Sequence, residues 1–356
     1  MRRNPLLDRT AGSILTAGEI DETISAITAV QLPTGCIPWF MGGPCDPWDH
    51  VEATMALTTG GRLEEAERGF RWLADVQRSD GAWASEYRDN QATEDTLDAN
   101  FCSYIAVGLW HHWLATRDRS FVSEMWPVLE RAIDFTLDLQ ADSGAILWAR
   151  DESYRPWSRG LLTSSSCIYL SIRCAVALAE VVGEKRPDWE FPLEPLRLAI
   201  KERPEAFDPK DRYSMDWYYP VLGGALTDED ALARLDARWA DFVIAGRGTR
   251  CVLDRPWVTS AETCELVLAL DAAGLGDKAV RLFEWVQHLC SEDGAYWTGA
   301  TFPDGTVWPR EKPTWSSAVV VLAADALQRT SPTSGLFRGE GLPAAARVSE
   351  PVPDSF

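Results

Sequence analysis

The chain has 356 residues and carries 54 acidic against 34 basic side chains, which gives a formal net charge of −20. A negative excess of this size repels phosphate, so it argues against nucleic acid and anionic lipid surfaces as partners. Hydrophobic residues make up 46% of the chain, enough for a large core, and we expect the 17 tryptophans to line a cleft or to fill a repeated packing position.

The sequence predicts a cytoplasmic protein without membrane insertion. The first residues contain no apolar run with a cleavage site, and the longest apolar stretch, at 318–327, is too short for a membrane span and includes Asp325. The eight cysteines are scattered without a CxxC pair, and there are only four histidines. We therefore expect the cysteines to be small buried apolar residues, and we expect no metal or other cofactor. The sequence leaves a homodimer open.

A turn that runs from Gln through Gly to Trp recurs along the chain. Its clearest copy is QRSDGAW at 77–83. The other copies are Gln31, Gly35 and Trp39; Gln140, Gly144 and Trp148; and Gln287, Gly294 and Trp297. A period of roughly 50 residues indicates a supersecondary unit stacked on its neighbours. We expect Gly to take a left-handed conformation, Gln to bond loop backbone and Trp to pack between repeats.

The repeated unit is a helix, the turn, a loop and a second helix. Six pairs follow in chain order: 18–30 with 47–59, 62–77 with 94–115, 120–140 with 162–183, 192–204 with 213–225, 228–244 with 258–273, and 276–290 with 313–328. The first helix of a pair is amphipathic, whereas the second is apolar on nearly all sides and therefore buried. Six exposed helices around six buried ones predict an all-α fold, a closed (α/α)6 barrel. We assign 13–330 to this catalytic domain and expect 331–356 to be a disordered or surface-draped tail.

The loops that lead into the six buried helices are expected to meet at one mouth of the barrel, because alternate helices run antiparallel. They bring aromatic and acidic residues together, among them Glu52, Glu262 and Tyr219. The expected substrate contacts are Asp46, Trp48, Asp49, His50, Trp83, Asp98, Trp148, Trp217, Tyr218, Trp257 and Trp315. Aromatic faces stack on sugar rings and carboxylates bond hydroxyls, so the mouth suits carbohydrate. An alternative role as helix caps stays open for acids at helix starts, among them Asp46, Asp95 and Asp216.

Three segments resemble the six-hairpin glycosidases, particularly the glucoamylase-like enzymes, in a layout that covers about 20–330. DPWDHVEATMAL at 46–57 is similar to their first buried helix, although the Arg of their Trp-x-Arg-Asp motif is missing. GAILWARDE at 144–152 is similar to the segment with their general acid, which implies Glu152, with Asp151 as its rival. PREKPTWSSA at 309–318 is similar to the segment with their general base and implies Glu311, although the spacing is shorter.

The Gln/Gly/Trp turn also resembles the terpenoid cyclases and the protein prenyltransferase β-subunits. Their aromatic cavities stabilise carbocations. The chain has no DxDD acid of the cyclases, and no Asp-x-Cys with a downstream His near a mouth loop, as a prenyltransferase zinc site would need. A sugar isomerase on the same barrel would need a mouth histidine, for which His50 is the candidate, and a barrel that binds sugar without turnover is a further alternative.

The favoured hypothesis is an inverting glycoside hydrolase that acts inside the cell on a small sugar or oligosaccharide. In this hypothesis Glu152 protonates the leaving oxygen and Glu311 activates water on the opposite face of the sugar. An inverting pair of this kind stands about 6.5–9.5 Å apart. The expected partner is therefore a sugar substrate. No metal is required, although the clustered carboxylates could hold calcium.

Overall fold

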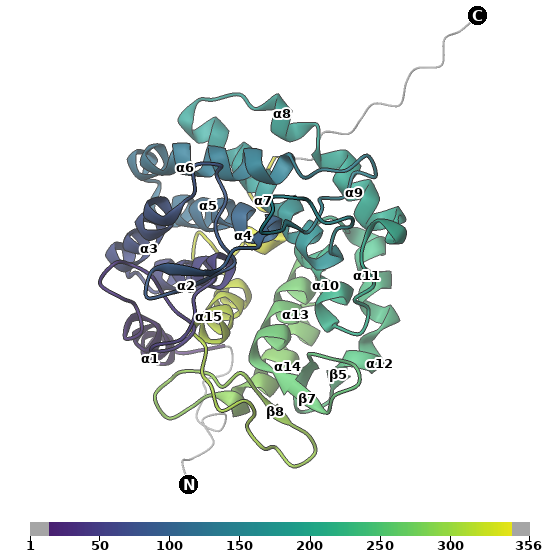
Figure 1. The fold of residues 1–356 in the computed structure, drawn as a ribbon. Coiled ribbons are helices and arrows are strands. Elements are labelled where there is room, and N and C mark those ends of the chain that lie inside the picture. Colours follow the sequence, from purple (N-terminus) through teal and green to yellow (C-terminus); the bar gives the residue numbers. More distant parts are fainter. Residues whose placement is uncertain (1–13, 344–356) are drawn as a thin grey trace, which may run out of the picture.

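The computed structural model describes residues 14–343, which form a closed ring of helices (Figure 1). The inner ring consists of α2 (Pro47–Thr59), α4 (Ala99–Ser103) with α5 (Ile105–Thr116), α7 (Leu162–Val182), α10 (Ser214–Leu222), α13 (Ser260–Ala272) and α15 (Thr314–Gln328). Each inner helix packs on the next in chain order, and α15 closes the ring by packing on α2. The predicted all-α (α/α)6 barrel is confirmed.

An outer layer of helices covers this ring. It comprises α1 (Ala17–Thr28), α3 (Leu63–Val76), α6 (Arg119–Leu137), α9 (Leu193–Glu202), α11 (Asp228–Ala237) and α14 (Gly276–Val286), with the short α8 (Pro187–Glu190) and α12 (Trp239–Phe242). Single-turn 3-10 helices lie at Pro204–Ala206, Gln287–Leu289 and Leu336–Arg338. The outer helices are charged on one face and apolar on the other, whereas nearly every residue of α13 and α15 is buried. The six predicted pairs therefore match the observed helices to within a few residues, apart from two breaks. One divides the second inner helix into α4 and α5, and the other divides the predicted helix 228–244 into α11 and α12.

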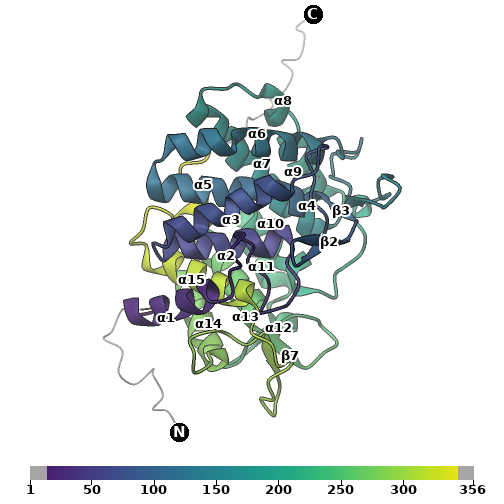
Figure 2. The ribbon, with the colours of Figure 1, turned by 60° about the vertical axis from the view of Figure 1, so that its left-hand side comes forward.

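Short strands occur only in the loops, within the described part of the chain. β1 (Glu86–Arg88) pairs with β2 (Gln91–Glu94), and β3 (Leu97–Asp98) pairs with β4 (Ala149–Arg150). The antiparallel order β5-β6-β7-β8 joins Val243–Ile244, Gly248–Arg250, Trp257–Thr259 and Gly299–Thr301, with Val258 opposite Ala300. These strands lie at the end of the barrel where the inner helices begin (Figure 2). They link neighbouring mouth loops, so they hold those loops in place.

The Gln/Gly turn ties each repeat to the next outer helix. The side-chain amide of Gln77 donates to the carbonyls of Gly81 and Val128, each at 2.9 Å. The equivalent amides of Gln31 and Gln140 make the same two kinds of bond. Gly81 has a φ of +90°, and a Cβ there would lie 2.2 Å from the Arg131 carbonyl oxygen. The expected structural role is thus confirmed in three copies, while Gln287 departs from it and bonds within its own turn.

Helix α7 is the one helix in the range 14–343 that is long and apolar enough to cross a membrane, but most of it is buried inside the barrel. It packs between α5, α6, α9 and α10, as the core helix of a barrel must. Six of the cysteines are buried, Cys251 is half-buried and Cys290 is exposed.

The described part of the predicted tail, 331–343, lies against the barrel. The hydroxyls of Ser331 and Thr333 donate to Asp325, and Arg338 pairs with Asp271 at the far end of α13. Residues 344–356, the rest of that tail, are outside the described residues.

Candidate active site

The first turns of the inner helices gather acidic side chains at one mouth. Asp46 is the N-cap of α2, where it accepts a bond from the Asp49 amide at 2.9 Å, and Asp98 caps α4 in the same way. Glu52 follows one turn into α2, and Glu262 lies in the first turn of α13. The capping alternative is therefore correct for Asp46 and wrong for Asp95 and Asp216, because the residues at the N-cap positions of α4 and α10 are Asp98 and Tyr213. Asp46 and Asp98 each also point a carboxyl oxygen at a tryptophan. The Trp39 indole donates to Asp46 at 2.7 Å, and the Trp148 indole donates to Asp98.

Aromatic rings join these carboxylates into one cluster. The Trp48 ring lies 5.9 Å from Tyr104 and 5.9 Å from Tyr219, between ring centroids, so it links α2 to α4 and α10. The Tyr218 and Tyr219 hydroxyls both donate to Glu265, on the second turn of α13. The Tyr104 hydroxyl donates to Glu52 at 3.4 Å. Carboxylates from α2 and α13 are thus held by tyrosines that come from other repeats.

No cation balances the mouth carboxylates. In the part of the chain that the structure describes, no ion pair within 4 Å involves any of Asp46, Asp49, Glu52, Asp98, Glu262 and Glu265. Their partners are hydroxyls, indoles and backbone amides, such as the Thr259 hydroxyl that donates to Glu262. Buried negative charge without a counterion is costly, so part of this cluster must hold protons.

The pKa values of the cluster rise because of burial and mutual repulsion. The pKa of Asp49 is well above its usual range, chiefly through burial and then through the charges of Asp46 and Glu52. Burial also raises the pKa of Glu265 to about 7, with a further contribution from Glu262, while the two tyrosine hydroxyls lower it. Burial likewise raises the pKa of Asp98 to about 6. The mouth therefore offers protonated carboxyls near neutral pH, which general acid catalysis needs.

Asp46 and Asp49 differ in how far their surroundings favour the protonated form. Burial raises the pKa of both carboxyls, and the charge of Asp46 raises that of Asp49 further, whereas hydrogen bonds from Asp49 and Trp39 oppose the rise at Asp46. Asp46 accepts from the Trp39 indole and the Asp49 amide, both of which favour its ionised form. Asp49 is the partly exposed member of the pair, so its proton faces the open mouth.

Several of the predicted sugar contacts lie at this mouth with part of their surface free. Trp48, Trp148, Trp257 and Trp315 are each only half-buried, so a ring face is available for stacking. Trp315 packs edge-on against Trp39 with ring centroids 6.5 Å apart. Trp257 extends the aromatic surface to Trp308, at 5.2 Å, on the loop after β8. Tyr218 is fully buried and acts on Glu265 instead.

Three predicted contacts face the outer helices instead of the mouth. His50 accepts from the Ile37 amide, and its other ring nitrogen bonds the Gly69 carbonyl at 2.9 Å. Burial lowers the pKa of His50 to about 4, so it stays neutral. The indoles of Trp83 and Trp217 donate to backbone carbonyls of the outer helices α3 and α11, and both rings are buried. The structure uses these residues for packing because adjacent helical positions point in different directions: Asp49 faces the mouth and His50 faces away.

The predicted acid–base pair lies in exposed loop segments. Glu152 is exposed in the turn after β4, and its neighbour Asp151 accepts from the Ser153 and Arg155 amides within that same turn. Glu311 is also exposed, and its backbone carbonyl accepts from the Thr298 amide at 3.0 Å. Neither side chain is buried as the carboxylates of the mouth cluster are, and their pairing stays a prediction.

The predicted set left out Glu265 and Tyr104, which the structure places in the cluster. Glu265 stands three residues after Glu262 in a helix that is otherwise almost wholly apolar, and this pair of acids in a buried helix was the available signal. The described residues contain no group of three or more His, Cys, Asp or Glu side chains arranged to hold a metal ion.

Comparison with known proteins agrees with a sugar-cleaving site. No family model matches the chain. It is 52% identical over 339 residues to an MMP endo-(1,4)-3-O-methyl-alpha-D-mannosidase of Mycolicibacterium hassiacum, which covers 95% of this chain and 94% of the relative. A shorter match, 25% identical over 162 residues, links 44% of this chain to a quarter of an uncharacterized glycosyl hydrolase of Methanocaldococcus jannaschii.

Solved structures show the same barrel at low sequence identity. A glycosidase in complex with glucose superposes with a TM-score of 0.68 at 15% identity, over 87% of this chain and 96% of its own. A GH63 mannosylglycerate hydrolase of Thermus thermophilus superposes with a TM-score of 0.67 at 12% identity, over 85% of this chain and 99% of its own. A D-mannose isomerase superposes with a TM-score of 0.65 at 10% identity, over 88% of this chain and 98% of its own.

The fold, the mouth and these relatives define a glycoside hydrolase on an (α/α)6 barrel. The chain belongs to the family of the 3-O-methyl-mannosidase from Mycolicibacterium hassiacum. The predicted resemblance to six-hairpin glycosidases is confirmed, and family membership decides for this class over the terpenoid cyclase and prenyltransferase alternatives.

Proposed function

We propose that the chain is an endo-acting mannosidase that hydrolyses α-(1,4) bonds between 3-O-methyl-mannose units. The observation that carries this proposal is the 52% identity, along nearly the whole chain, with a relative whose name states that activity. The substrate is then a sugar chain and not a single small sugar. Half-buried tryptophans beside uncharged carboxyls suit such a neutral ligand. We place the reaction in the cytoplasm, as the sequence predicted.

The general acid in this proposal is Asp49. Its pKa is raised well above the usual range by burial and by the charge of Asp46, which favours the protonated form that a general acid needs. It is also partly exposed, and an acid must reach the leaving oxygen of the sugar. Asp46 holds it in place through the bond from the Asp49 amide.

The general base in this proposal is Glu262. Its carboxylate accepts from the Thr259 hydroxyl and lies in the first turn of α13, where the helix dipole favours negative charge. Helices α2 and α13 both pack on α15, so the helices that carry Asp49 and Glu262 lie on either side of it. For inversion of the anomeric centre their carboxyls must stand about 6.5–9.5 Å apart with water between them.

The test compares this buried pair with the exposed pair Glu152 and Glu311. Asp49→Asn and Glu262→Gln should each lower kcat on α-(1,4)-linked 3-O-methyl-mannose oligosaccharides by about 10²–10⁴-fold, because each removes one proton-transfer group. Glu152→Gln and Glu311→Gln are the matched controls and should stay within a few-fold of the parent. Proton NMR of the first products reports both the rate and the anomer formed.

Each outcome of this comparison has a distinct meaning. Loss of activity in Glu152→Gln or Glu311→Gln, with Asp49→Asn and Glu262→Gln active, would return the reaction to the loop pair. Retention of the anomeric configuration would contradict an inverting mechanism. Absence of any turnover by the parent enzyme on these oligosaccharides would overturn the proposed substrate.

A further inference from the structure

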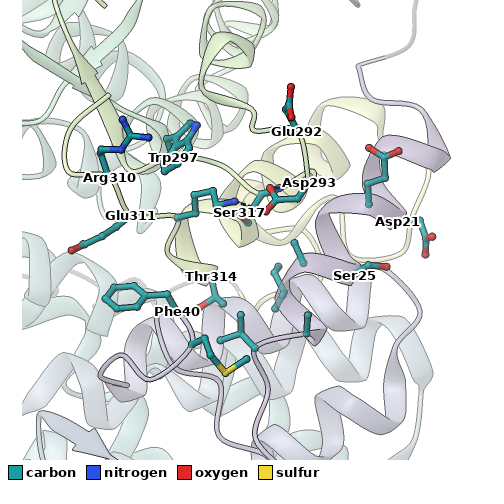
Figure 3. Close-up of a pocket in the computed structure, with 18 residues that line it drawn as sticks. Asp21, Ser25, Phe40, Glu292, Asp293, Trp297, Arg310, Glu311, Thr314 and Ser317 are labelled. Atoms are coloured by element: carbon teal, nitrogen blue, oxygen red, sulfur yellow. Dashed lines mark hydrogen bonds and ion pairs between the residues drawn. The ribbon is translucent and has the colours of Figure 1, made fainter. Parts of the chain in front are cut away.

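A groove of about 900 Å³ lies outside the ring, between α1 and the 292–312 segment that precedes α15. Figure 3 shows its two ends: Phe40, Arg310 and Glu311 stand at one end, and Asp21 and Ser25 of α1 stand at the other. None of these residues belongs to the acid–base proposal. The volume falls within the range of natural small-molecule sites, about 300–1,000 Å³, and suffices for a ligand of more than one ring.

The floor of the groove is apolar and its rim is charged. Ala26, Ile27 and Ala295 form part of the floor, while Trp297 lies along one wall. Met41 at the rim is 68% exposed, which is unusual for a large apolar side chain with no partner to cover it. The groove therefore presents a large apolar surface that water covers in the free protein.

The charges on the rim select against an anionic ligand. The lining includes more acidic than basic side chains: the acidic ones are Asp21, Glu22, Glu292, Asp293 and Glu311, and the basic ones are Arg310 and Lys312. Lys312 is already engaged, because its ammonium pairs with Asp293 and lies 5.2 Å from the centroid of the Trp297 ring. A neutral ligand with apolar patches and some hydroxyl groups matches this combination better than a phosphate or a carboxylate does.

Trp39 links the inner end of the groove to the candidate active site. The Thr314 amide, at the start of α15, donates to the Trp39 carbonyl at 2.7 Å, and its hydroxyl donates to the Pro38 carbonyl at 2.9 Å. The same Trp39 donates its indole N–H to Asp46 in the carboxylate cluster. Phe40 of the groove is thus the immediate chain neighbour of a residue that touches the cluster.

We propose that this groove is a distal subsite for an O-methylated, uncharged stretch of the sugar chain that is being cleaved. The inference rests on the proposed function, since an enzyme that cuts inside a chain must hold units on both sides of the bond. A methyl ether lacks the hydroxyl donor of a free sugar and adds apolar surface, so it gains from an apolar floor. The groove then binds units remote from the cleaved bond and favours long substrates over short ones.

The experiment fills part of the groove with a large side chain introduced at the end of helix α1. Ala29, the exposed C-cap of α1, lines the groove, so Ala29→Trp places a large side chain in it. Ala17, the exposed first residue of α1, does not line the groove, so Ala17→Trp is the matched control. KM and kcat are measured on 3-O-methyl-mannose oligosaccharides of increasing length. For Ala29→Trp we expect KM to rise about tenfold on long chains only, with kcat and the short-chain KM unchanged. Ala17→Trp should match the parent at every length.

A second variant tests the role of the methyl groups. Met41→Ser removes exposed apolar surface without touching the core, and we expect it to weaken binding of methylated chains about threefold while unmethylated α-(1,4)-mannose chains bind unchanged. Binding is followed by calorimetry on Glu262→Gln protein, which does not depend on turnover.

The failures of the two proposals can be told apart. Equal behaviour of Ala29→Trp and Ala17→Trp on long chains, or an equal loss on all lengths, would overturn the groove as a distal subsite. If the parent enzyme turns over none of these oligosaccharides, the proposed function fails, and calorimetry with long methylated chains still decides whether the groove binds them.

Discussion

The two ends of helix α13 bury acidic side chains in opposite ways. At its start, Glu262 and Glu265 have hydroxyl partners, from Thr259 and from two tyrosines. Near its other end, Asp271 is as deeply buried but pairs with the guanidinium groups of Arg329 and Arg338. A buried carboxylate that is neutralised by cations is a structural tie, whereas burial among neutral donors raises the pKa of a carboxyl, to about 7 at Glu265. The same helix thus holds a structural end and a reactive end.

The largest effect on stability is expected at the structural end. Asp271→Asn keeps the shape of the side chain but takes one counterion from the mostly buried Arg338, which retains its pair with the exposed Glu340. We expect a loss of about 3–4 kcal/mol in the free energy of unfolding, toward the lower end of the cost of breaking a buried pair, because Arg338 keeps that second partner. Kinetics of the folded enzyme should not change, since the mouth lies at the other end of the helix.

Chemical denaturation with a matched surface control checks this expectation. Asp254→Asn breaks the exposed pair with Arg212 and should cost less than about 0.5 kcal/mol. An Asp271→Asn variant as stable as Asp254→Asn would show that the two ends of α13 do not differ in the way described.

A smaller change in the free energy of unfolding, this time a gain in stability, is expected from Glu265→Gln at the start of α13. The pKa of Glu265 is raised from 4.5 to about 7 in the folded protein, so the folded state holds this proton more tightly than the unfolded state does. Its contribution to stability is complete below pH 4.5 and is lost as the pH rises through about 7. Glu265→Gln removes this dependence and should stabilise the protein above pH 7 by up to about 3 kcal/mol relative to its effect at pH 4.5.

The measurement is the difference in unfolding free energy between Glu265→Gln and the parent at a series of pH values. The difference cancels the titration of groups that both proteins share. A flat difference from pH 4.5 to 8 would mean that Glu265 does not carry the extra proton, and a difference that favours the parent at high pH would reverse the assignment.

Repetition explains how much of the molecule could be predicted from the sequence. The helix pairs and the Gln/Gly turn follow from a local pattern that recurs, so each copy supported the others. The site does not repeat: Asp49, Asp98 and Glu262 come from different positions in their units, and no spacing relates them. The resemblance to known enzymes implies Glu152 and Glu311, which lie in exposed loops and stay predictions. The burial of Glu262 and Glu265 cannot be read from a motif.

Helical direction explains the remaining differences. His50 follows Asp49 directly, yet it packs on Trp72 of the outer helix α3, with ring centroids 4.6 Å apart, while Asp49 faces the mouth. Trp217 and Tyr218 divide in the same way between Phe242 of the outer layer and Glu265 of the cluster. A list of loop and first-turn residues contains side chains that face the mouth and side chains that pack on the outer helices. Only the folded barrel shows to which group each residue belongs.

The smallest expected effect concerns the turns, which lie beside the mouth but belong to the structure. Gly81 and Gly61 both have positive φ, +90° and +73°, so Gly→Ala at either position costs about 1–2 kcal/mol of backbone strain. Only at Gly81 does the new Cβ meet backbone, the Arg131 carbonyl oxygen at 2.2 Å, whereas at Gly61 nothing lies within 4 Å. We expect Gly81→Ala to be less stable than Gly61→Ala by about 2 kcal/mol in denaturation, because the turn must move away from α6. The activity of the folded Gly81→Ala protein should be retained, since the turn carries no carboxyl of the cluster. Equal stability of the two variants would mean that the turn does not pack tightly on the next repeat, and a selective loss of kcat would mean that turn and site are coupled.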